Sequence, residues 1–210
     1  MANTRIEHDF LGDREIPNDK YYGIQTLRAI ENFQITGIPI SHSPELIKAY
    51  AMVKKACAQT NEELQVLKPQ ISRAIQEASD CIIKGELCEQ FPVDTIQGGA
   101  GTSTNMNINE VIANKALELL GKPKGAYDIV HPNNHVNCSQ STNDTYPTAF
   151  RLALHQDLNK LIKSLRALEA AFTSKGEEFK DILKMGRTQL QDAVPMALGD
   201  EFSAFAVTLD

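Results

Sequence analysis

The sequence has no long apolar run. No stretch approaches the roughly 18 consecutive apolar residues of a membrane-spanning helix, and the polar segment from Met1 to Arg14 has no signal-peptide apolar region. We therefore expect a cytoplasmic protein without a membrane partner. Basic residues are outnumbered as well: 21 Lys and Arg face 27 Asp and Glu, for a net charge of -6. That balance argues against a nucleic-acid partner, so any bound anion must be held by local groups.

Cysteine is sparse and shows no framework. The four cysteines have neither CxxC spacing nor the density of a disulfide scaffold, and they are Cys57, Cys81, Cys88 and Cys138. We expect reduced, mostly buried thiols. By contrast, 210 residues with 42 % hydrophobic and 23 % charged side chains are typical of a soluble globular protein with one large domain or two small ones.

Helical patterns dominate after residue 42. Turn signals interrupt residues 1–42, which we expect to be extended or irregular. Apolar spacing and capping residues then predict three helices, which run from Pro44 behind the N-cap Ser43, from near Pro69 to Gly85, and from about Asn105 to Leu120.

The strongest pattern is an apolar seam with spacing 4, 3, 4, 3, 4, formed by Leu154, Leu158, Leu161, Leu165, Leu168 and Phe172. It is typical of a long bundle helix. Leaving this seam in water would forfeit on the order of 10 kcal/mol, so the helix needs partners.

A second stretch of this kind begins after Pro195 and comprises Leu198, Phe202, Phe205 and Leu209. It reaches Asp210 without a stop signal. We therefore expect an all-α fold that is cut inside a helix: an N-terminal helical domain over residues 1–140, followed by the first part of a truncated long-helix bundle over residues 141–210.

Three stretches are more polar than packing requires. The first, residues 97–107, combines glycines with hydroxyl and amide side chains at a predicted helix start, where an anion can bind. A nucleotide loop is disfavoured, because the third glycine of GxGxxG, a preceding strand and the P-loop Lys are all missing. Taken alone, this stretch is interpreted as a glycine-rich cap without ligand.

The second stretch, residues 131–144, lies ahead of the long helix. It carries four consecutive capping-type residues from Ser141 to Asp144, more than one cap needs. His131 and His135 could suggest a metal, but Pro132 prevents a continuous helix and no carboxylate or thiol pattern completes a site. We interpret them as loop histidines and expect no metal.

The third stretch, residues 186–195, has the plain interpretation of an interhelix loop. It nevertheless brings hydroxyl and amide groups to another predicted helix start. Three such starts in one helical protein suggest one composite pocket, in which neutral donors and helix termini would bind carboxylates.

These stretches carry a family resemblance. GAGTSTNMNINEV (99–111), SQSTND (139–144) and GRTQLQDAVP (186–195), with YYGIQTLRAIENF (21–33), closely resemble aspartate ammonia-lyases of the aspartase/fumarase superfamily. The resemblance covers essentially the whole chain. It implies an all-helical protein with a central long-helix bundle that forms a homotetramer, of which more than half would be missing here.

Two positions favour aspartases over fumarases. Fumarases typically have Ser-Ser-Asn-Asp in the second motif and Thr-His in the third, whereas this chain has Thr142 and Gln189. Other aspartases have His at the latter position, so any role of a histidine there is in doubt.

The resemblance implies reversible deamination of L-aspartate to fumarate and ammonia, without a cofactor. Removal of the C3 proton would build an aci-carboxylate. By resemblance, Thr102, Ser141 and Thr142 would hold the β-carboxylate, Asn143 would contact the amino group, and Thr188 with Gln189 would hold the α-carboxylate.

The base is expected elsewhere. In the family it is a serine on a loop with the pattern GSS-x-M-P-x-K-x-N-P, which would lie beyond Asp210 with a substrate-anchoring lysine. The family's site is also assembled from three subunits. We therefore expect these 210 residues alone to be catalytically inactive.

Three alternatives stay open at this stage. A fumarase would hydrate fumarate to malate, and assays of the full-length protein with both substrates would separate the two. A non-catalytic helical assembly module belongs to another class, since the superfamily includes crystallin-like proteins. The third is a nucleotide-binding module.

Overall fold

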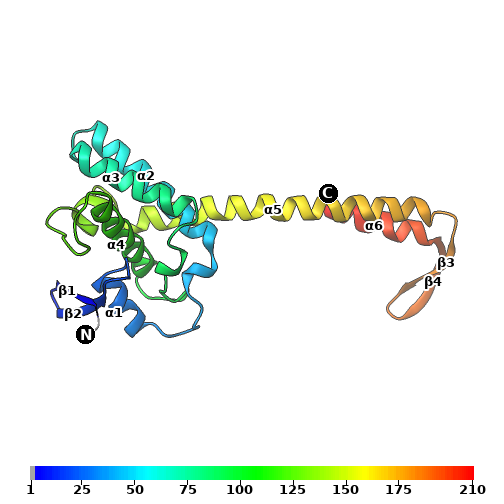
Figure 1. Ribbon diagram of the computed structural model, residues 1–210. Helices are drawn as coiled ribbons and strands as arrows, with labels where there is room; N and C mark the ends of the chain where they lie inside the picture. Colours follow the sequence, from blue (N-terminus) through cyan, green and yellow to red (C-terminus); the bar gives the residue numbers. More distant parts are fainter. Residues whose placement is uncertain (1–2) are drawn as a thin grey trace. The chain divides into compact units, whose positions relative to one another are not determined.

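Helices dominate the computed structural model, which describes residues 3–210 (Figure 1). The fold is mainly α, as the sequence predicts. The chain divides into two compact units, one through Leu154 and one from His155 to Asp210. The predicted domain boundary between residues 140 and 141 stays a prediction.

The N-terminal segment is more regular than the sequence suggested. The prediction of extended or irregular structure for residues 1–42 is wrong for the described part, and residues 1–2 lie outside it. Strands β1 (Thr4–Asp9) and β2 (Gly12–Pro17) form an antiparallel hairpin, followed by helix α1 (Ile24–Asn32) and the short 3₁₀ turn η1 (Ile40–His42).

Long-range polar contacts explain why this segment has no clear apolar period. The Glu7 carboxylate accepts a hydrogen bond from the Ile24 amide at 2.9 Å, and Glu110 accepts one from the Gly23 amide at 2.8 Å. Two carboxylates distant in sequence therefore cap α1. Such a cap cannot be read from local spacing.

The three predicted helices are confirmed as α2 (Pro44–Glu63), α3 (Pro69–Ile83) and α4 (Thr102–Leu119). Helix α4 begins three residues earlier than predicted, directly after Gly101. A short 3₁₀ turn, η2 (Cys88–Gln90), lies between α3 and α4.

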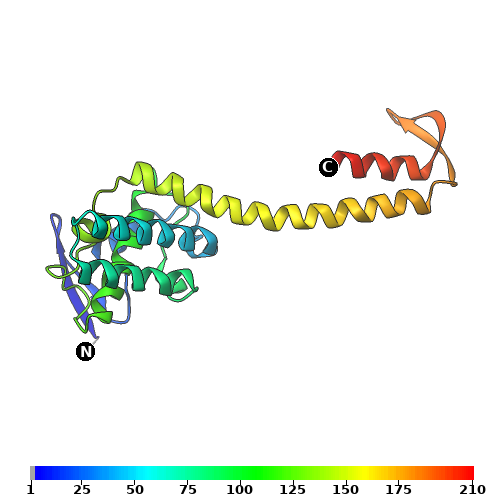
Figure 2. The same ribbon diagram turned by 90° about the horizontal axis from the view of Figure 1, so that it is seen from above.

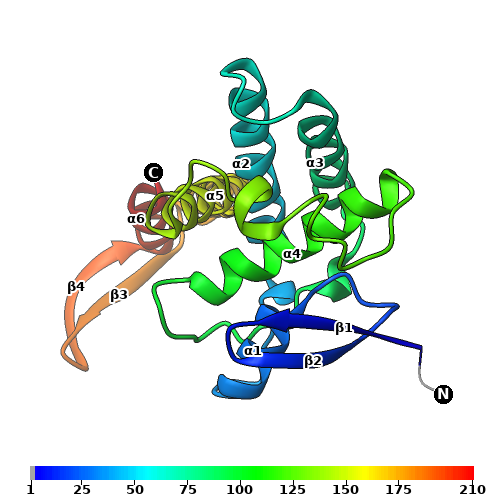
Figure 3. The same ribbon diagram turned by 90° about the vertical axis from the view of Figure 1, so that its left-hand side faces the viewer.

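Helix α4 forms the centre of the first unit. Figure 3 shows it between the α2–α3 pair and the β1–β2 hairpin with α1, and α2 and α3 also lie side by side in Figure 2. Six of its apolar side chains are fully buried: Ile108, Val111, Ile112, Ala113, Ala116 and Leu117. The helix is therefore packed on several sides, which fixes its first turn.

Helix α5 (Thr142–Glu178) carries the predicted seam. Leu154, Leu158, Leu161 and Leu168 are 42 to 52 % exposed in the described chain. Such an apolar strip on one helix is typical of a surface that packs against a partner.

In the second unit, helix α6 (Leu198–Leu209) lies alongside the last part of α5 in Figures 1 and 2. The ring centroids of Phe172 and Phe205 are 5.5 Å apart, and those of Phe179 and Phe202 are 5.3 Å apart. The predicted second apolar helix is confirmed.

The interhelix loop predicted for residues 186–195 is wrong, because these residues form most of a hairpin. Strand β3 (Leu183–Thr188) pairs antiparallel with β4 (Gln191–Ala197), with Thr188 opposite Gln191. The turn residues Gln189 and Leu190 have φ of 48° and 61°. Because these residues are neither Gly nor Asn, the usual sequence signal of such a turn is missing.

All four cysteines are free thiols, but the expectation that they are mostly buried is wrong. Cys57, Cys81 and Cys138 are partly buried and Cys88 is exposed. None of the described helices is both long and apolar enough for a membrane span.

Candidate active site

The glycine-rich loop ends directly in the first turn of α4. Gly99, Ala100 and Gly101 all have positive φ, and Gly101 is the N-cap residue. The Thr102 hydroxyl donates a hydrogen bond to the Gly99 carbonyl. The loop therefore turns back on itself and presents the start of α4 to solvent.

Gly101 also fixes how the loop meets α5. A Cβ atom on Gly101 would lie 2.1 Å from Cδ2 of the Tyr146 ring, so only glycine allows this approach. The contact brings the start of α4 against the second turn of α5. Two of the three predicted polar segments, 97–107 and 131–144, are thus neighbours within the first unit.

The start of α5 has an N-cap of its own. The Asn143 amide donates to the Ser141 hydroxyl at 3.2 Å, and the Thr145 amide donates to the Ser141 carbonyl at 3.0 Å. Ser141 and Asn143 are exposed and Thr142 is half-buried. Their polar groups are available at the positive end of a helix dipole.

Asn143 and the glycine-rich loop line one pocket of about 530 Å³, together with Gln97, Tyr146 and others. Thr102 faces a different pocket of about 550 Å³, which is also lined by His131 and Asn133. Asn143 and the glycine-rich loop thus line the same pocket, whereas Thr102 lines a different one.

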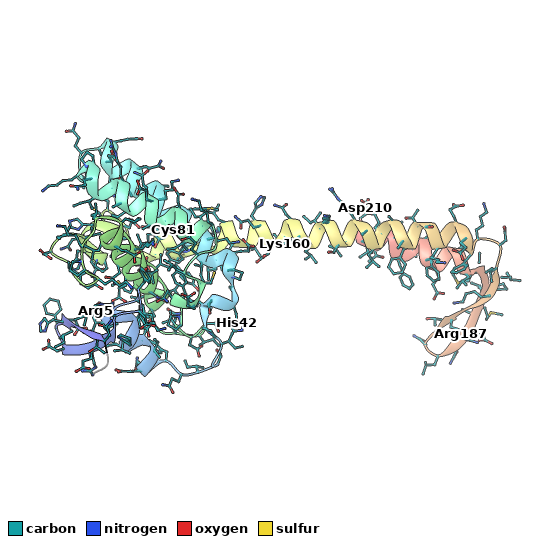
Figure 4. All side chains as sticks on the ribbon, in the orientation of Figure 1. Arg5, His42, Cys81, Lys160, Arg187 and Asp210 are labelled. Carbon is teal, nitrogen blue, oxygen red and sulfur yellow. The ribbon has the colours of Figure 1, made fainter. Side chains whose placement is uncertain are left out.

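Thr188 and Gln189 belong to the second unit, at the exposed end of the β3–β4 hairpin. Figure 4 labels the preceding residue, Arg187, on this hairpin. The expectation that these side chains lie at a helix start is wrong, since α6 begins only at Leu198. Their meeting with Thr102 and Ser141–Asn143 stays a prediction.

Both histidine rings accept hydrogen bonds from backbone amides of their own turn. His131 Nδ1 accepts hydrogen bonds from the Asn133 and Asn134 amides at 3.0 and 3.2 Å, and His135 Nδ1 accepts one from the His131 amide at 2.8 Å. Burial lowers the pKa of both imidazoles. His131 is the N-cap of the short helical turn η3 (Pro132–Val136) and His135 lies inside that turn, so the interpretation as loop histidines is wrong for His135. Across residues 3–210, no group of three or more His, Cys, Asp and Glu is arranged to hold a metal.

Sequence reasoning missed a buried polar cluster behind these helix starts. The Lys54 ammonium group on α2 is fully buried and donates to Asn105, Asn137 and Gln140. Lys54 looks like its partly exposed neighbour Lys55 in the sequence, so only its place on the apolar face of α2 could have signalled burial.

Comparison with known proteins identifies the family of the chain. The lyase family matches residues 12–210 of the chain. The chain belongs to this lyase family. Among the relatives of the chain, aspartate ammonia-lyase of Pseudomonas aeruginosa is 59 % identical over 209 residues, covering 100 % of this chain and 44 % of the relative. Aspartate ammonia-lyase of Escherichia coli (strain K12) is 56 % identical over 208 residues, 99 % of this chain and 44 % of the relative.

Solved structures agree with the fold of this chain. A fumarate lyase:delta crystallin from Brucella melitensis in native form has a TM-score of 0.95 and 59 % identity, over 98 % of this chain and 48 % of that one. A class II fumarase from Schistosoma mansoni has a TM-score of 0.88 and 36 % identity, over 98 % and 43 %. The chain thus spans less than half the length of these relatives.

Proposed function

We propose that the full-length protein containing these residues reversibly deaminates L-aspartate to fumarate and ammonia. The observation that carries the proposal is the pairing of two helix starts: Gly101 at α4 packs on Tyr146 of α5, and the same pocket holds Asn143. Two helix N-termini with neutral donors suit a dicarboxylate. Relatives named aspartate ammonia-lyase at 54 to 60 % identity support aspartate as the substrate.

The chemistry requires charge stabilisation. The proton on C3 lies next to a carboxylate, so its removal places a second negative charge on that group. Donors from Thr102, Ser141 and Thr142 would stabilise the resulting aci-carboxylate. Asn143 would contact the amino group that leaves as ammonia, and Thr188 with Gln189 would hold the other carboxylate.

The base and the assembly lie outside these residues in the proposal. A serine beyond residue 210 would take the proton, so the 210 residues alone would be inactive. A homotetramer would bring Thr188 and Gln189 of the bundle to the helix starts. We place this enzyme in the cytoplasm. No step in the proposal calls for a cofactor.

The test is an assay of the full-length protein with aspartate and with malate, in which fumarate is followed by its ultraviolet absorbance. We expect fumarate from aspartate and little from malate. Fumarate from malate alone would instead support the fumarase alternative, for which the 36 % identity to the Schistosoma mansoni fumarase is weaker support than the 54 to 60 % identity to relatives named aspartate ammonia-lyase. No product from either substrate would favour the non-catalytic assembly module.

A further inference from the structure

Lys54 lies fully buried on α2 and makes three short hydrogen bonds. Its Nζ atom lies 2.8 Å from Asn105 Oδ1, 2.8 Å from Asn137 Oδ1 and 2.9 Å from Gln140 Oε1. All three acceptors are neutral amide oxygens. Three acceptors match the three protons of an ammonium group, so the cation is satisfied by dipoles.

The acceptors come from the two segments that carry the proposed substrate contacts. Asn105 lies in the first turn of α4, three residues after Thr102. Asn137 and Gln140 lie in the segment that leads into Ser141. A single ammonium group therefore contacts both segments at once.

Further hydrogen bonds join the same two segments directly. Asn137 Oδ1 accepts from Asn105 Nδ2 at 3.1 Å and from Asn109 Nδ2 at 3.2 Å. The Thr145 hydroxyl of α5 lies 3.4 Å from Asn105 Oδ1. Lys54 and these side chains thus form one connected buried network between α2, α4 and the start of α5.

A buried cation is an expensive way to fill this space. Burial lowers the pKa of Lys54 to about 7, because the charged form loses its water. An apolar side chain of similar volume is often as good or better for stability alone. Ala51 and Ala58, which lie beside Lys54 on the buried face of α2, are apolar. The charge of Lys54 and its three directed hydrogen bonds therefore indicate that this residue holds its partner segments in a defined geometry, and does not only fill the core.

We propose that Lys54 is a positioning residue: its ammonium group fixes the first turn of α4 and the 137–140 segment relative to each other, and so sets the places of Thr102 and Ser141–Asn143. The inference rests on the proposed function, because it assigns Lys54 a task in that site. Lys54 itself does not touch the substrate.

The main test compares Lys54→Met with Lys55→Met in the full-length protein. Methionine keeps a long apolar stem but donates no hydrogen bond. Lys55 is the matched control, since it lies next in the same helix and pairs with Asp80 at 2.7 Å on the partly exposed side. We expect Lys54→Met to lower kcat for aspartate about 100-fold per folded protein, with a smaller change in KM. The reason is that a displacement of the substrate-binding donors by about 1 Å lowers the reaction rate by about that factor. Lys55→Met stays within about threefold of the unchanged protein.

A second arm needs no activity. In the 210-residue chain labelled with ¹⁵N-lysine, we expect one ammonium resonance that exchanges slowly with water, absent in Lys54→Met and retained in Lys55→Met. Hydrogen exchange in Lys54→Met should quicken in residues 101–106 and 137–146, while α3 keeps its protection. If Lys54→Met does not fold, Asn105→Ala removes one acceptor and is expected to lower kcat about 10-fold.

Two results would overturn the inference: a folded Lys54→Met enzyme with kcat within threefold of the unchanged protein, or exchange that quickens equally through α2, α3 and α4. An unchanged full-length protein that does not act on aspartate would instead refute the proposed function, and the labelled-lysine arm would still report whether the ammonium group links the two segments.

Discussion

Gly101 combines two constraints in one residue. Its φ of 88° is unfavourable for any residue with a side chain, and a Cβ atom would overlap the Tyr146 ring. Gly121 also has a positive φ, of 67°, but open space surrounds its missing Cβ. The two glycines therefore separate the effect of backbone strain from that of crowding.

Gly101→Ala is expected to lower the free energy of unfolding by about 2–4 kcal/mol, since backbone strain and overpacking against Tyr146 add. Gly121→Ala should cost only about 1 kcal/mol, from strain alone. Urea denaturation of the 210-residue chain measures both. Equal losses would mean that the Tyr146 ring moves aside and that the loop is not held against α5.

Substitution of Thr142 tests one of the proposed hydrogen-bond donors by itself. Thr142→Val keeps the shape but removes the hydroxyl, and it should lower kcat/KM for aspartate by about 10² to 10³ in the full-length protein. Thr148→Val, six residues along α5, removes a hydroxyl that only donates to the Asp144 carbonyl, so it should have little effect. A Thr142→Val enzyme as active as the Thr148→Val control would remove Thr142 from the site.

Helix α1 depends on a carboxylate that is remote in sequence. Glu110 is fully buried, and its oxygens accept from the Gly23, Gln25 and Thr26 amides and from the Thr26 hydroxyl. Burial, aided by the Glu7 charge, outweighs these donors and raises the pKa of Glu110 from 4.5 to about 7.

This shift predicts how stability varies with pH. Between pH 4.5 and about 7 the folded chain holds a proton on Glu110 that the unfolded chain releases. The free energy of unfolding should therefore fall as pH rises through this window, by at most about 3 kcal/mol. Glu110→Gln should flatten the slope, whereas Glu77→Gln on the exposed face of α3 should keep it. The measurement is urea unfolding across the window. An unchanged slope in Glu110→Gln would contradict the assignment.

Elements with local signals were the predictable ones. Helices α2, α3 and α4 follow from proline starts, apolar spacing and glycine ends, and α5 follows from the Leu154–Phe172 seam. Helix α1 was missed because Glu7 and Glu110 cap it through contacts that are distant in sequence. The β1–β2 hairpin was missed because β1 lacks an apolar buried face: its buried side chain is Glu7, while Ile6 is exposed. The β3–β4 hairpin was missed because its turn uses Gln189 and Leu190.

The candidate site likewise has a part that could be predicted from the sequence and a part that could not. Hydroxyl and amide clusters marked Thr102 and Ser141–Asn143, and the contact of Gly101 with Tyr146 explains how their segments meet. Lys54 was missed, because its place on the apolar face of α2 is its only local signal and the acceptors of its ammonium group are distant in sequence. Those acceptors lie 51 to 86 positions along the chain.

At the scale of the whole molecule, the exposed seam of α5 should drive association. We expect the 210-residue chain, of 23.2 kDa, to scatter light as a multiple of that mass. Leu158→Lys with Leu161→Lys should lower the mass, since charge on the seam opposes its burial. The control, Gln156→Lys with Asn159→Lys, adds the same charge away from the seam and should leave it unchanged. Equal masses for both double variants would refute an interface on the seam.

The central claim is that separate helix starts and the β3–β4 hairpin jointly bind one dicarboxylate. A crystal structure of the full-length assembly with bound fumarate tests it most directly. We expect Thr102, Ser141–Asn143 and Thr188 to lie within hydrogen-bond distance of the same ligand, about 2.7–3.2 Å. Fumarate bound away from these residues, or Thr188 facing a surface unrelated to the two helix starts, would contradict the account.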